Sequence, residues 1–469
     1  MNNRSFVRVG LSLAAAMLVP ALAGAQSGPA AAAPTYSKEV APILYKNCTV
    51  CHRPGEIGPF SMLTYTETRP WVKAIASQVS NGTMPPWHAD PAYGTFVNDR
   101  RLSAAEKDTI VKWVAAGAPE GNRADLPAPP VYPSGWAIGK PDAVFEMTEA
   151  YPVPASGTID YKHFEVPTNL TEDKWISSFE IKPEARSVVH HIIVYARPPR
   201  PSAPPAQAAG DRQASAPPAG AQRQGPPFTM APGMNTPPEH RTTMAHGATP
   251  NDRPVPKEGL GIFVGGFAPG QAIRVYNEGT AMRLPAGSTL IFQVHYTAGG
   301  KPVNDRSKIA FVWAKSAPKQ EVMTLPLING NFTLPAGSPN TQVDAQMTFN
   351  TETTIWSILP HTHVRGREWK VEVTYPDGRK EVVLAVPKYD FNWQTDYVFK
   401  EALKLPKGTR IRAVAHYDNS TRNRANPDPK AEVSWGDQTW EEMMFTSFVY
   451  SLDGVAPGAI ITTRPGGQQ

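Results

Sequence analysis

Two cysteines and a histidine form the most specific short motif of the chain, at Cys48, Cys51 and His52. Two thiols at i and i+3 lie on one face of a helical turn, where they can bond the two vinyl groups of a haem. The following histidine then points at the iron from the same side. A redox dithiol leaves the histidine unexplained, and a zinc site of this kind needs a second cysteine pair that the chain lacks. The C-x-x-C-H run therefore predicts one c-type haem.

The iron of such a haem needs a second axial ligand, and Met84 is the candidate that the sequence favours. Met84 follows His52 by 32 residues and lies in the proline-stiffened run Thr83-Met84-Pro85-Pro86-Trp87. This run resembles the distal methionine loop of class I cytochromes c, and a thioether ligand raises the haem potential and suits electron transfer. Met62, which is close to the attachment motif, and His88 are the alternatives.

The second half of the chain holds histidines and methionines whose spacing suits a metal. His361 and His363 at i and i+2 share one face of a strand, whereas the adjacent His190 and His191 face opposite sides unless a bulge or a strand end intervenes. A lone strand histidine is more often a packed core residue, but imidazoles together with a thioether suit copper. Zinc more often takes carboxylate or thiolate ligands. The set comprises His190, His191, His295, His361, His363 and one or both of Met443 and Met444.

In this order, the motifs resemble the copper type II, ascorbate-dependent monooxygenases, which include the peptidylglycine hydroxylating and dopamine β-monooxygenases. The resemblance covers residues 142 to 460 and implies two β-sandwich domains, each holding one copper and facing a solvent cleft. It assigns His190, His191 and His295 to the copper that stores an electron. It assigns His361, His363 and Met443 to the copper that takes O2 and attacks a C–H bond. Met443 is preferred because the family ligand follows an acidic pair, here Glu441-Glu442.

Three departures from the family pattern bear on stability and substrate. Both cysteines are assigned to haem, so the sandwiches must be stable by packing without disulfides. The peptide-amidating enzyme has an arginine two residues before the His-Thr-His run and an Asn and a Tyr after the methionine, whereas this chain has Leu359, Phe445 and Ser447. We therefore do not expect a peptide ending in glycine as substrate. A large insertion also separates two ligands of the same copper.

The elements that must position these residues change along the chain. A Ser103/Glu106 capping box before apolar residues at helical spacing predicts a helix that Gly117 ends. From Asp142 onward, alternating apolar residues and turn signals predict strands. We expect a multidomain chain with a small all-α cytochrome c domain followed by two all-β, antiparallel, jelly-roll-like sandwiches. The predicted boundaries are 35–122 for the cytochrome c domain, 123–141 for a linker, and 142–315 and 316–465 for the sandwiches.

Two further features accompany the predicted sandwiches. Residues 198–256 hold 15 prolines and few large apolar residues, which predicts a disordered insertion in the first sandwich. His240 and His246 in this insertion are read as solvent-exposed loop residues. A Leu-Pro-x-Gly run precedes both His295-Tyr296 and His416-Tyr417 by seven residues, which is a faint internal repeat. At the repeat position of His295, His416 is a candidate spare ligand or supporting residue.

Composition and targeting signals narrow the setting. The 46 basic and 41 acidic residues give a net charge of +5, which is too weak to argue for nucleic-acid binding. No stretch of 18 apolar residues exists, so no membrane span is expected. Residues 1–25 are typical of a signal peptide, because Arg4 and Arg8 precede an apolar run and the small residues Ala23-Gly24-Ala25 follow it. The protein is therefore expected to be periplasmic or otherwise exported.

These observations together predict an oxidoreductase. The expected protein is an exported copper-dependent monooxygenase with one haem c and two coppers that hydroxylates a C–H bond of a small-molecule substrate with O2. The fused haem delivers electrons one at a time, in place of ascorbate or beside it, and a redox donor protein is an expected partner. The alternative is a non-catalytic periplasmic electron-transfer or copper-binding protein on the same fold.

Overall fold

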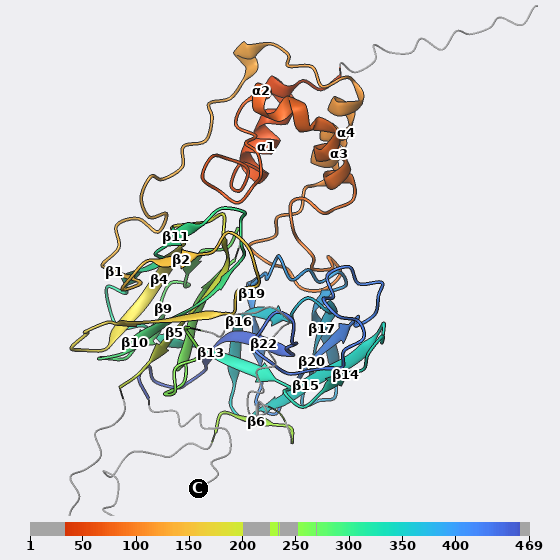
Figure 1. The fold of residues 1–469 in the computed structure, drawn as a ribbon. Helices are drawn as coiled ribbons and strands as arrows, with labels where there is room; N and C mark the ends of the chain where they lie inside the picture. Colours follow the sequence, from red (N-terminus) through yellow and green to blue (C-terminus); the bar gives the residue numbers. More distant parts are fainter. Residues whose placement is uncertain (1–32, 200–225, 233, 235–251, 269, 460–469) are drawn as a thin grey trace, which may run out of the picture.

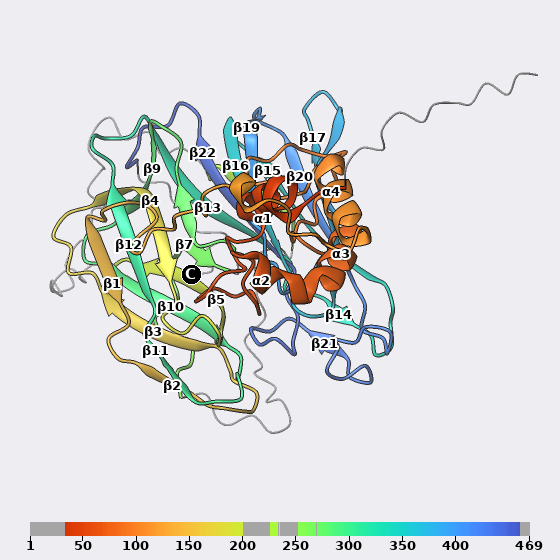
Figure 2. The same cartoon turned by 90° about the horizontal axis from the view of Figure 1, so that it is seen from above.

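The structure is a computed structural model that describes residues 33–199, 226–232, 234, 252–268 and 270–459. Figures 1 and 2 show a helical part of the chain stacked against two groups of strands that lie side by side. The expected signal peptide at 1–25 and most of the proline-rich insertion, including His240 and His246, lie outside the described residues.

The helical segment, residues 33–125, contains short helices joined by loops. Its small core is formed by buried residues such as Tyr36, Leu44, Ile110 and Trp113. The expected capping box precedes the longest helix, α4, which confirms the predicted helix start. The helices are η1 Tyr36–Val40, α1 Ala41–Asn47, α2 Tyr65–Thr68, η2 Arg69–Trp71, α3 Val72–Ser80, α4 Ala104–Ala115 and η3 Arg123–Asp125.

The expectation of a small all-α cytochrome c domain ahead of the strands is wrong. The four α-helices have only 7, 4, 9 and 12 residues. Among the described residues, strands make up 37% and helices 11%, and no small all-α cytochrome domain is seen there. Prolines explain part of the difference, because Pro70 lies in the short 3-10 helix η2 and Pro85-Pro86 disfavour a helix after α3. Apolar residues at helical spacing therefore build short helices here.

The first sandwich consists of two layers that enclose a core with Phe164, Ile176, Phe292 and Phe311. One layer has the order β3-β10-β5-β7, and the other contains β1, β12, β4 and β9, with β8 paired to β4. The strands of both layers are β1 Ala143–Glu146, β3 Lys162–Pro167, β4 Lys174–Lys182, β5 Val189–Arg197, β7 Ile262–Phe267, β8 Ile273–Val275, β9 Thr280–Leu284, β10 Thr289–Tyr296 and β12 Lys308–Trp313. A small outer pair is β2 Tyr151–Val153 with β11 Val303–Asp305.

The second sandwich is built in the same way around a core that includes Leu327, Trp369, Tyr417 and Phe448. One layer has the order β18-β17-β20-β15-β6, and the other has the order β13-β22-β16-β19. Its strands are β6 Phe228–Met230, β13 Gln320–Ile328, β15 Thr341–Phe349, β16 Thr353–His361, β17 Gly366–Thr374, β18 Lys380–Val386, β19 Tyr397–Leu405, β20 Arg410–Tyr417 and β22 Phe445–Leu452. A short pair joins β14 Thr333–Leu334 to β21 Val433–Ser434.

The predicted β-sandwich class is confirmed, but the two sandwiches share a sheet. β13 pairs in parallel with β9, through Gln320–Val322 and Thr280–Met282, so one nine-stranded sheet runs through both. The insertion also differs from the expectation of disorder in one place, because Phe228–Met230 pairs with β15 of the second sandwich. None of the helices in the described part of the chain has the length and apolar character needed to cross a bilayer.

Candidate metal centre

The first histidine group, His190, His191 and His295, lies on the neighbouring strands β5 and β10. His295 is opposite His191 in the antiparallel ladder, but the next pair joins Tyr296 to Val189, which leaves His190 as the extra residue of a β-bulge. A bulge re-aims the side chain of the extra residue. The bulge therefore allows the adjacent side chains of His190 and His191 to lie on the same side of the sheet and to share one site.

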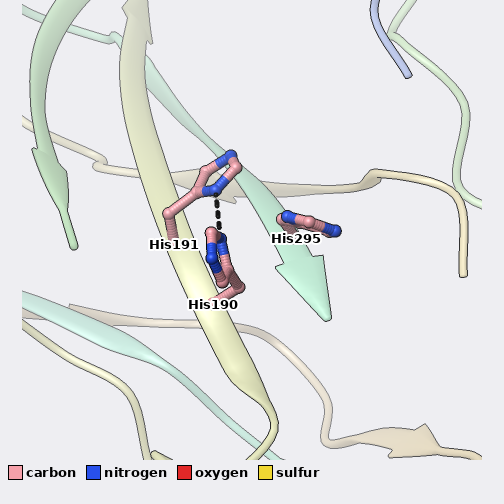
Figure 3. Close-up of side chains that lie close together, drawn as sticks. All are labelled: His190, His191 and His295. Carbon is pink, nitrogen blue, oxygen red and sulfur yellow. Dashed lines mark hydrogen bonds between the residues drawn. The ribbon is translucent and has the colours of Figure 1, made fainter. Parts of the chain in front are cut away.

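The three imidazoles of the first histidine group converge (Figure 3). One ring nitrogen from each side chain lies within 4.8 Å of the others. The ring centroids of His191 and His295 are 4.9 Å apart, and those of His190 and His295 are 5.0 Å apart. Nδ1 of His190 lies 3.1 Å from Nδ1 of His191, and its Nε2 lies 3.3 Å from the side-chain oxygen of Asn392.

Two nitrogens of the first histidine group fit a metal ion. Nε2 of His191 and Nδ1 of His295 are buried and have no hydrogen-bond partner within the described ranges. An unpaired buried polar atom costs about 1–3 kcal/mol, and an ion bound there would account for it. Burial, reinforced by neighbouring histidines, lowers the pKa of both imidazoles well below the ordinary value. They are therefore held neutral, which is the form that ligates metals.

The second histidine group, His361 and His363, lies at the end of β16 and in the turn after it. The two ring centroids are 5.2 Å apart. Nδ1 of His361 is 2.9 Å from Oε1 of Gln394, and Nδ1 of His363 is 3.1 Å from the backbone carbonyl of Glu441. These acceptors place the ring proton on Nδ1 and leave Nε2 with a free lone pair. Nε2 of His363 is buried and has no partner within the described part of the chain, so this group also fits a metal.

Glu442 fixes the turn that follows His361. Its carboxylate accepts the backbone N–H of His363 at 2.8 Å and that of Arg365 at 2.7 Å. Burial raises the pKa of Glu442 to about 7, although the backbone donors and the Arg365 guanidinium act in the opposite direction. The side chain is fully buried, so these backbone contacts take the place of solvation. From the sequence, Glu442 was expected only to mark the neighbouring methionine as a ligand, and its role in the turn depends on tertiary contacts.

The two candidate methionines lie in different surroundings. Met444 is fully buried in the core of the second sandwich. Met443 is half-buried and lines a cavity that His361 and His191 also line. Met443 therefore lines the same cavity as His361, and its assignment as a copper ligand in preference to Met444 stays a prediction.

One aromatic ring contacts all five histidines. The Phe391 ring stacks on His190 at a centroid distance of 5.2 Å and lies 5.9 Å from the ring of His363. It is also 6.2–6.4 Å from the rings of His191, His295 and His361. Tyr161 forms a second bridge, with its ring 4.8 Å from His295 and 6.4 Å from His363. The two histidine groups are thus parts of one buried cluster.

Phe391 belongs to a segment that sequence analysis missed, residues 389–394 between β18 and β19. Tyr389 Oη donates to the carbonyl of Thr362, Asn392 contacts His190, and Gln394 holds His361. This segment has no periodic pattern and no recognisable motif. Its role depends on contacts across long sequence separations, which a single sequence does not reveal.

The C-x-x-C-H residues lie after α1 in the helical segment. Cys48 and Cys51 are free thiols. Burial raises the pKa of Cys48 to about 12 and that of Cys51 in the same direction, so both are protonated. Nδ1 of His52 lies 3.2 Å from the carbonyl of Phe60, which leaves Nε2 for a ligand. A side chain at Gly58 would collide with the backbone of Cys51 and His52.

The donor types of this motif fit covalent attachment of haem, although the surrounding fold is not the expected one. Cys51 lines the cavity that reaches the histidine cluster, while Cys48 packs against the helical core. Met84 is half-buried in the loop after α3, where its backbone N–H donates to the carbonyl of Gln78. Its role as distal ligand stays a prediction.

The alternatives to Met84 and the candidate spare ligand take other positions. Met62 is buried in the core of the helical segment. His88 is half-buried, and burial lowers its pKa. His416 lies on β20, where its Nδ1 is 3.0 Å from the carboxylate of Glu368, and this contact gives it a structural partner outside the histidine cluster.

Comparisons with known proteins add little to this geometry. No family model matches the chain, and no curated protein matches it. Among solved structures, the major capsid protein P2 from bacteriophage PM2 is similar at 9% identity over 68% of this chain and 99% of that chain, with a TM-score of 0.25. The infectious bursal disease virus VP2 subviral particle matches at 12% identity over 67% and 69%, with a TM-score of 0.19. These low scores establish no shared fold, and the chain is assigned to no family by these comparisons.

Proposed function

We propose that this protein is a copper-dependent monooxygenase that hydroxylates a C–H bond of a small molecule with O2. The observation that carries the proposal is the buried five-histidine cluster, in which three imidazole nitrogens have no hydrogen-bond partner among the described residues. Nitrogen donors with a thioether, and no thiolate, favour copper over zinc. The order of the motifs, which resembles that of the copper type II monooxygenases, supports the same metal.

Each histidine group would hold one copper, and the Met443 thioether would complete the second site. Copper, when bound, supplies one-electron redox chemistry and activation of O2 at these positions. The overall reaction is R–H + O2 + 2 e⁻ + 2 H⁺ → R–OH + H2O. A one-electron donor must therefore act twice, and two separate one-electron centres suit that requirement.

The residues around the histidines keep them in ligating form. Gln394 and the carbonyl of Glu441 accept the Nδ1 protons of His361 and His363, which directs both Nε2 lone pairs away from the backbone. Contacts of this kind fix tautomer and ring orientation, and removing them typically costs 10–100-fold in metal affinity. The ring of Phe391 packs against His190, and the ring of Tyr161 packs against His295.

The electron donor of the proposal is a haem, which Cys48 and Cys51 would attach covalently and which His52 and Met84 would bind through the iron. Haem, when bound, supplies a one-electron carrier. The free thiols and the Phe60 contact of His52 support attachment. The signal-like sequence supports a periplasmic or otherwise exported location. An ascorbate-like reductant or a redox donor protein would serve as the external source of electrons.

Two matched substitutions test the catalytic proposal. Copper-loaded protein is given ascorbate, O2 and a panel of apolar substrates, and O2 uptake and hydroxylated product are measured. Met443→Leu should lower product formation at least tenfold, whereas Met444→Leu keeps core volume and should change it less than twofold. Equal rates in the two variants would overturn the role of Met443. Copper binding and reduction without O2 uptake on any substrate would favour a non-catalytic electron-transfer or copper-binding protein.

A further inference from the structure

A cavity of about 800 Å³ lies beside the histidine cluster. Residues of both sandwiches line it, and Val50, Cys51, Arg53 and Glu56 of the helical segment close one side. The volume is within the range of roughly 300–1,000 Å³ that is typical of small-molecule sites. The cavity is therefore large enough for a substrate well beyond the size of a single amino acid.

On two strands, the alternate residues that face the cavity form a row of side chains that includes one histidine. On β5, His191, Ile193 and Tyr195 follow one another at every second position and all line the cavity. On β16, Leu359 precedes His361 by two residues and lines the same cavity. Since successive side chains of a strand point to opposite faces, each row must present its members together. Each row joins apolar side chains to a candidate ligand.

The sheet of the second sandwich extends this apolar wall. Phe445, Ser447 and Val449 of β22 line the cavity. Ser447 is opposite Leu359 of β16 and Pro326 of β13 in the two ladders, and both neighbours also line the cavity. The alternate residues of β22, such as Phe448, point into the core of the second sandwich. This sheet thus separates a core on one face from the cavity on the other.

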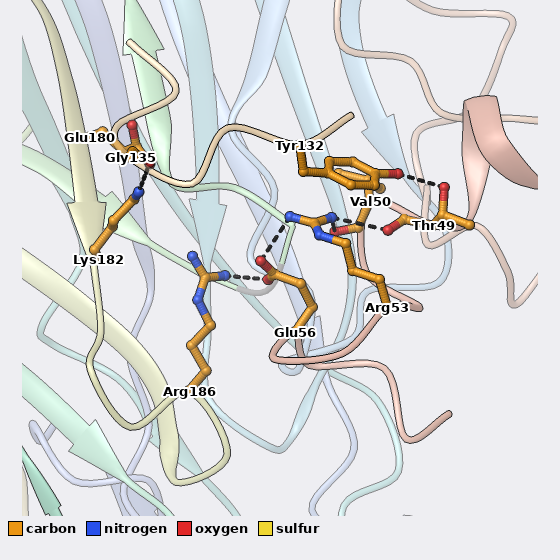
Figure 4. Close-up of polar contacts among 9 residues, drawn as sticks. All are labelled: Thr49, Val50, Arg53, Glu56, Tyr132, Gly135, Glu180, Lys182 and Arg186. Atoms are coloured by element: carbon orange, nitrogen blue, oxygen red, sulfur yellow. Dashed lines mark hydrogen bonds and ion pairs between the residues drawn. The ribbon is translucent and has the colours of Figure 1, made fainter. Parts of the chain in front are cut away.

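The charged residues at the cavity are largely engaged with one another (Figure 4). The Glu56 carboxylate pairs with Arg53 at 2.8 Å and with the guanidinium of Arg186. The Arg53 guanidinium also stacks 3.7 Å from the ring centre of Tyr132. Farther along the wall, Arg274 pairs with Asp396 at 2.7 Å. Four arginines and four acidic residues line the cavity, so their formal charges cancel.

We propose that the cavity binds an uncharged, predominantly apolar substrate, with one end against the row that leads to His361 and Met443. This inference rests on the proposed monooxygenase function and adds the chemical class of its substrate. An ionic ligand would lose its hydration in an apolar cavity whose rim offers no net charge in compensation. An apolar chain or ring system loses little hydration on entering, and its binding is favoured in proportion to the apolar area that it buries.

Displacement of a neutral fluorescent probe tests the substrate class. N-phenyl-1-naphthylamine is bound to the full-length protein, first free of metal and then loaded with copper. Competitors are 1-dodecanol, dodecanoate and dodecylammonium at pH 7, all below their micellar concentrations. The alcohol should displace the probe at a concentration at least tenfold lower than either ion. A preference for either ion, or no probe binding, would overturn the proposal. Copper content is measured separately. A protein that binds no copper but prefers the alcohol would contradict only the proposed copper function, whereas a copper-loaded protein that prefers an ion would contradict only the substrate class.

A matched pair of serine substitutions locates the binding. Ser447→Phe places a ring in the cavity and should weaken probe binding at least tenfold, while Ser80→Phe introduces the same ring at an exposed position of α3 and should leave it unchanged. Equal affinities in the two variants would show that the probe binds elsewhere. Circular dichroism checks that both variants fold. If Ser447→Phe does not fold, the competitor series in the unmodified protein still tests whether the cavity prefers an uncharged ligand.

Discussion

The two histidine groups are held by different means. In the first histidine group, all three residues lie on paired strands, and a bulge in β5 turns His190 toward its neighbours. In the second histidine group, only His361 belongs to a strand, and side chains and carbonyls from distant segments orient both rings. Sheet register therefore builds the first group, whereas a network of single contacts builds the second. The second group should be more sensitive to substitutions outside the ligands.

The largest expected effect comes from Glu442→Ala, which removes the acceptor of the His363 and Arg365 backbone donors. Leaving these buried N–H groups unpaired should lower the free energy of unfolding by about 3–5 kcal/mol. Chemical denaturation measures the change, and Glu432→Ala at an exposed position is the control. The variant should lose copper from the second group and keep it in the first. Equal loss of copper from both histidine groups would contradict the conclusion that different contacts hold the two groups.

In the first sandwich, His163 should make the free energy of unfolding depend on pH. Burial lowers the pKa of His163 to about 4, and its Nδ1 is 3.1 Å from the carbonyl of Arg253. The unfolded chain takes up this proton near pH 6.5, so the contribution of neutral His163 is complete above that pH and is lost as the pH falls toward 4. The loss amounts to about 3 kcal/mol at most. Chemical denaturation at several pH values between 4 and 6.5 measures the free energy of unfolding. This free energy should change less steeply with pH in His163→Gln than in the unmodified protein. Identical pH dependences would refute the role of His163.

A smaller effect is expected from Gln394→Ala, which removes the acceptor that orients His361. Copper affinity of the second group should fall about 10–100-fold, because the ring loses its fixed tautomer and direction. Competition with a chelator of known affinity measures this change. An unchanged affinity would mean that β16 alone orients the ring.

The smallest effect is expected at the corresponding contact of the first group. Asn392→Ala removes a contact of 3.3 Å to His190, whose ring is also held by the bulge and by Phe391. Copper affinity of the first group should change by less than about threefold, as for a long, single hydrogen bond. The same chelator competition, run beside Gln394→Ala, measures the ratio. A larger loss of copper affinity in Asn392→Ala than in Gln394→Ala would mean that the first group, and not the second, depends more on single contacts.

Sequence patterns predicted the parts of this site that depend on strand periodicity. Alternation predicted strands such as β17. It also placed His361 and His363 on one strand face, but β16 ends at His361, so His363 lies in the turn after it. For the adjacent pair at 190–191, the sequence left a bulge, a strand end or different ring nitrogens open, and β5 contains the bulge. The helical segment was overpredicted, since local propensity and a haem motif do not determine how long helices become. The parallel join of β9 to β13, the strand at Phe228–Met230 and the contacts of Phe391 all arise from long-range packing. Such pairings follow from tertiary structure and leave no local periodicity.

Anomalous diffraction at the copper edge, from crystals of the full chain grown with Cu(II), tests directly whether the two histidine groups hold copper. Two strong peaks per chain are expected, one among the ring nitrogens of His190, His191 and His295 and one between His361, His363 and Met443. Crystals in which copper is absent from both histidine groups, or is bound only at surface residues, would contradict this expectation.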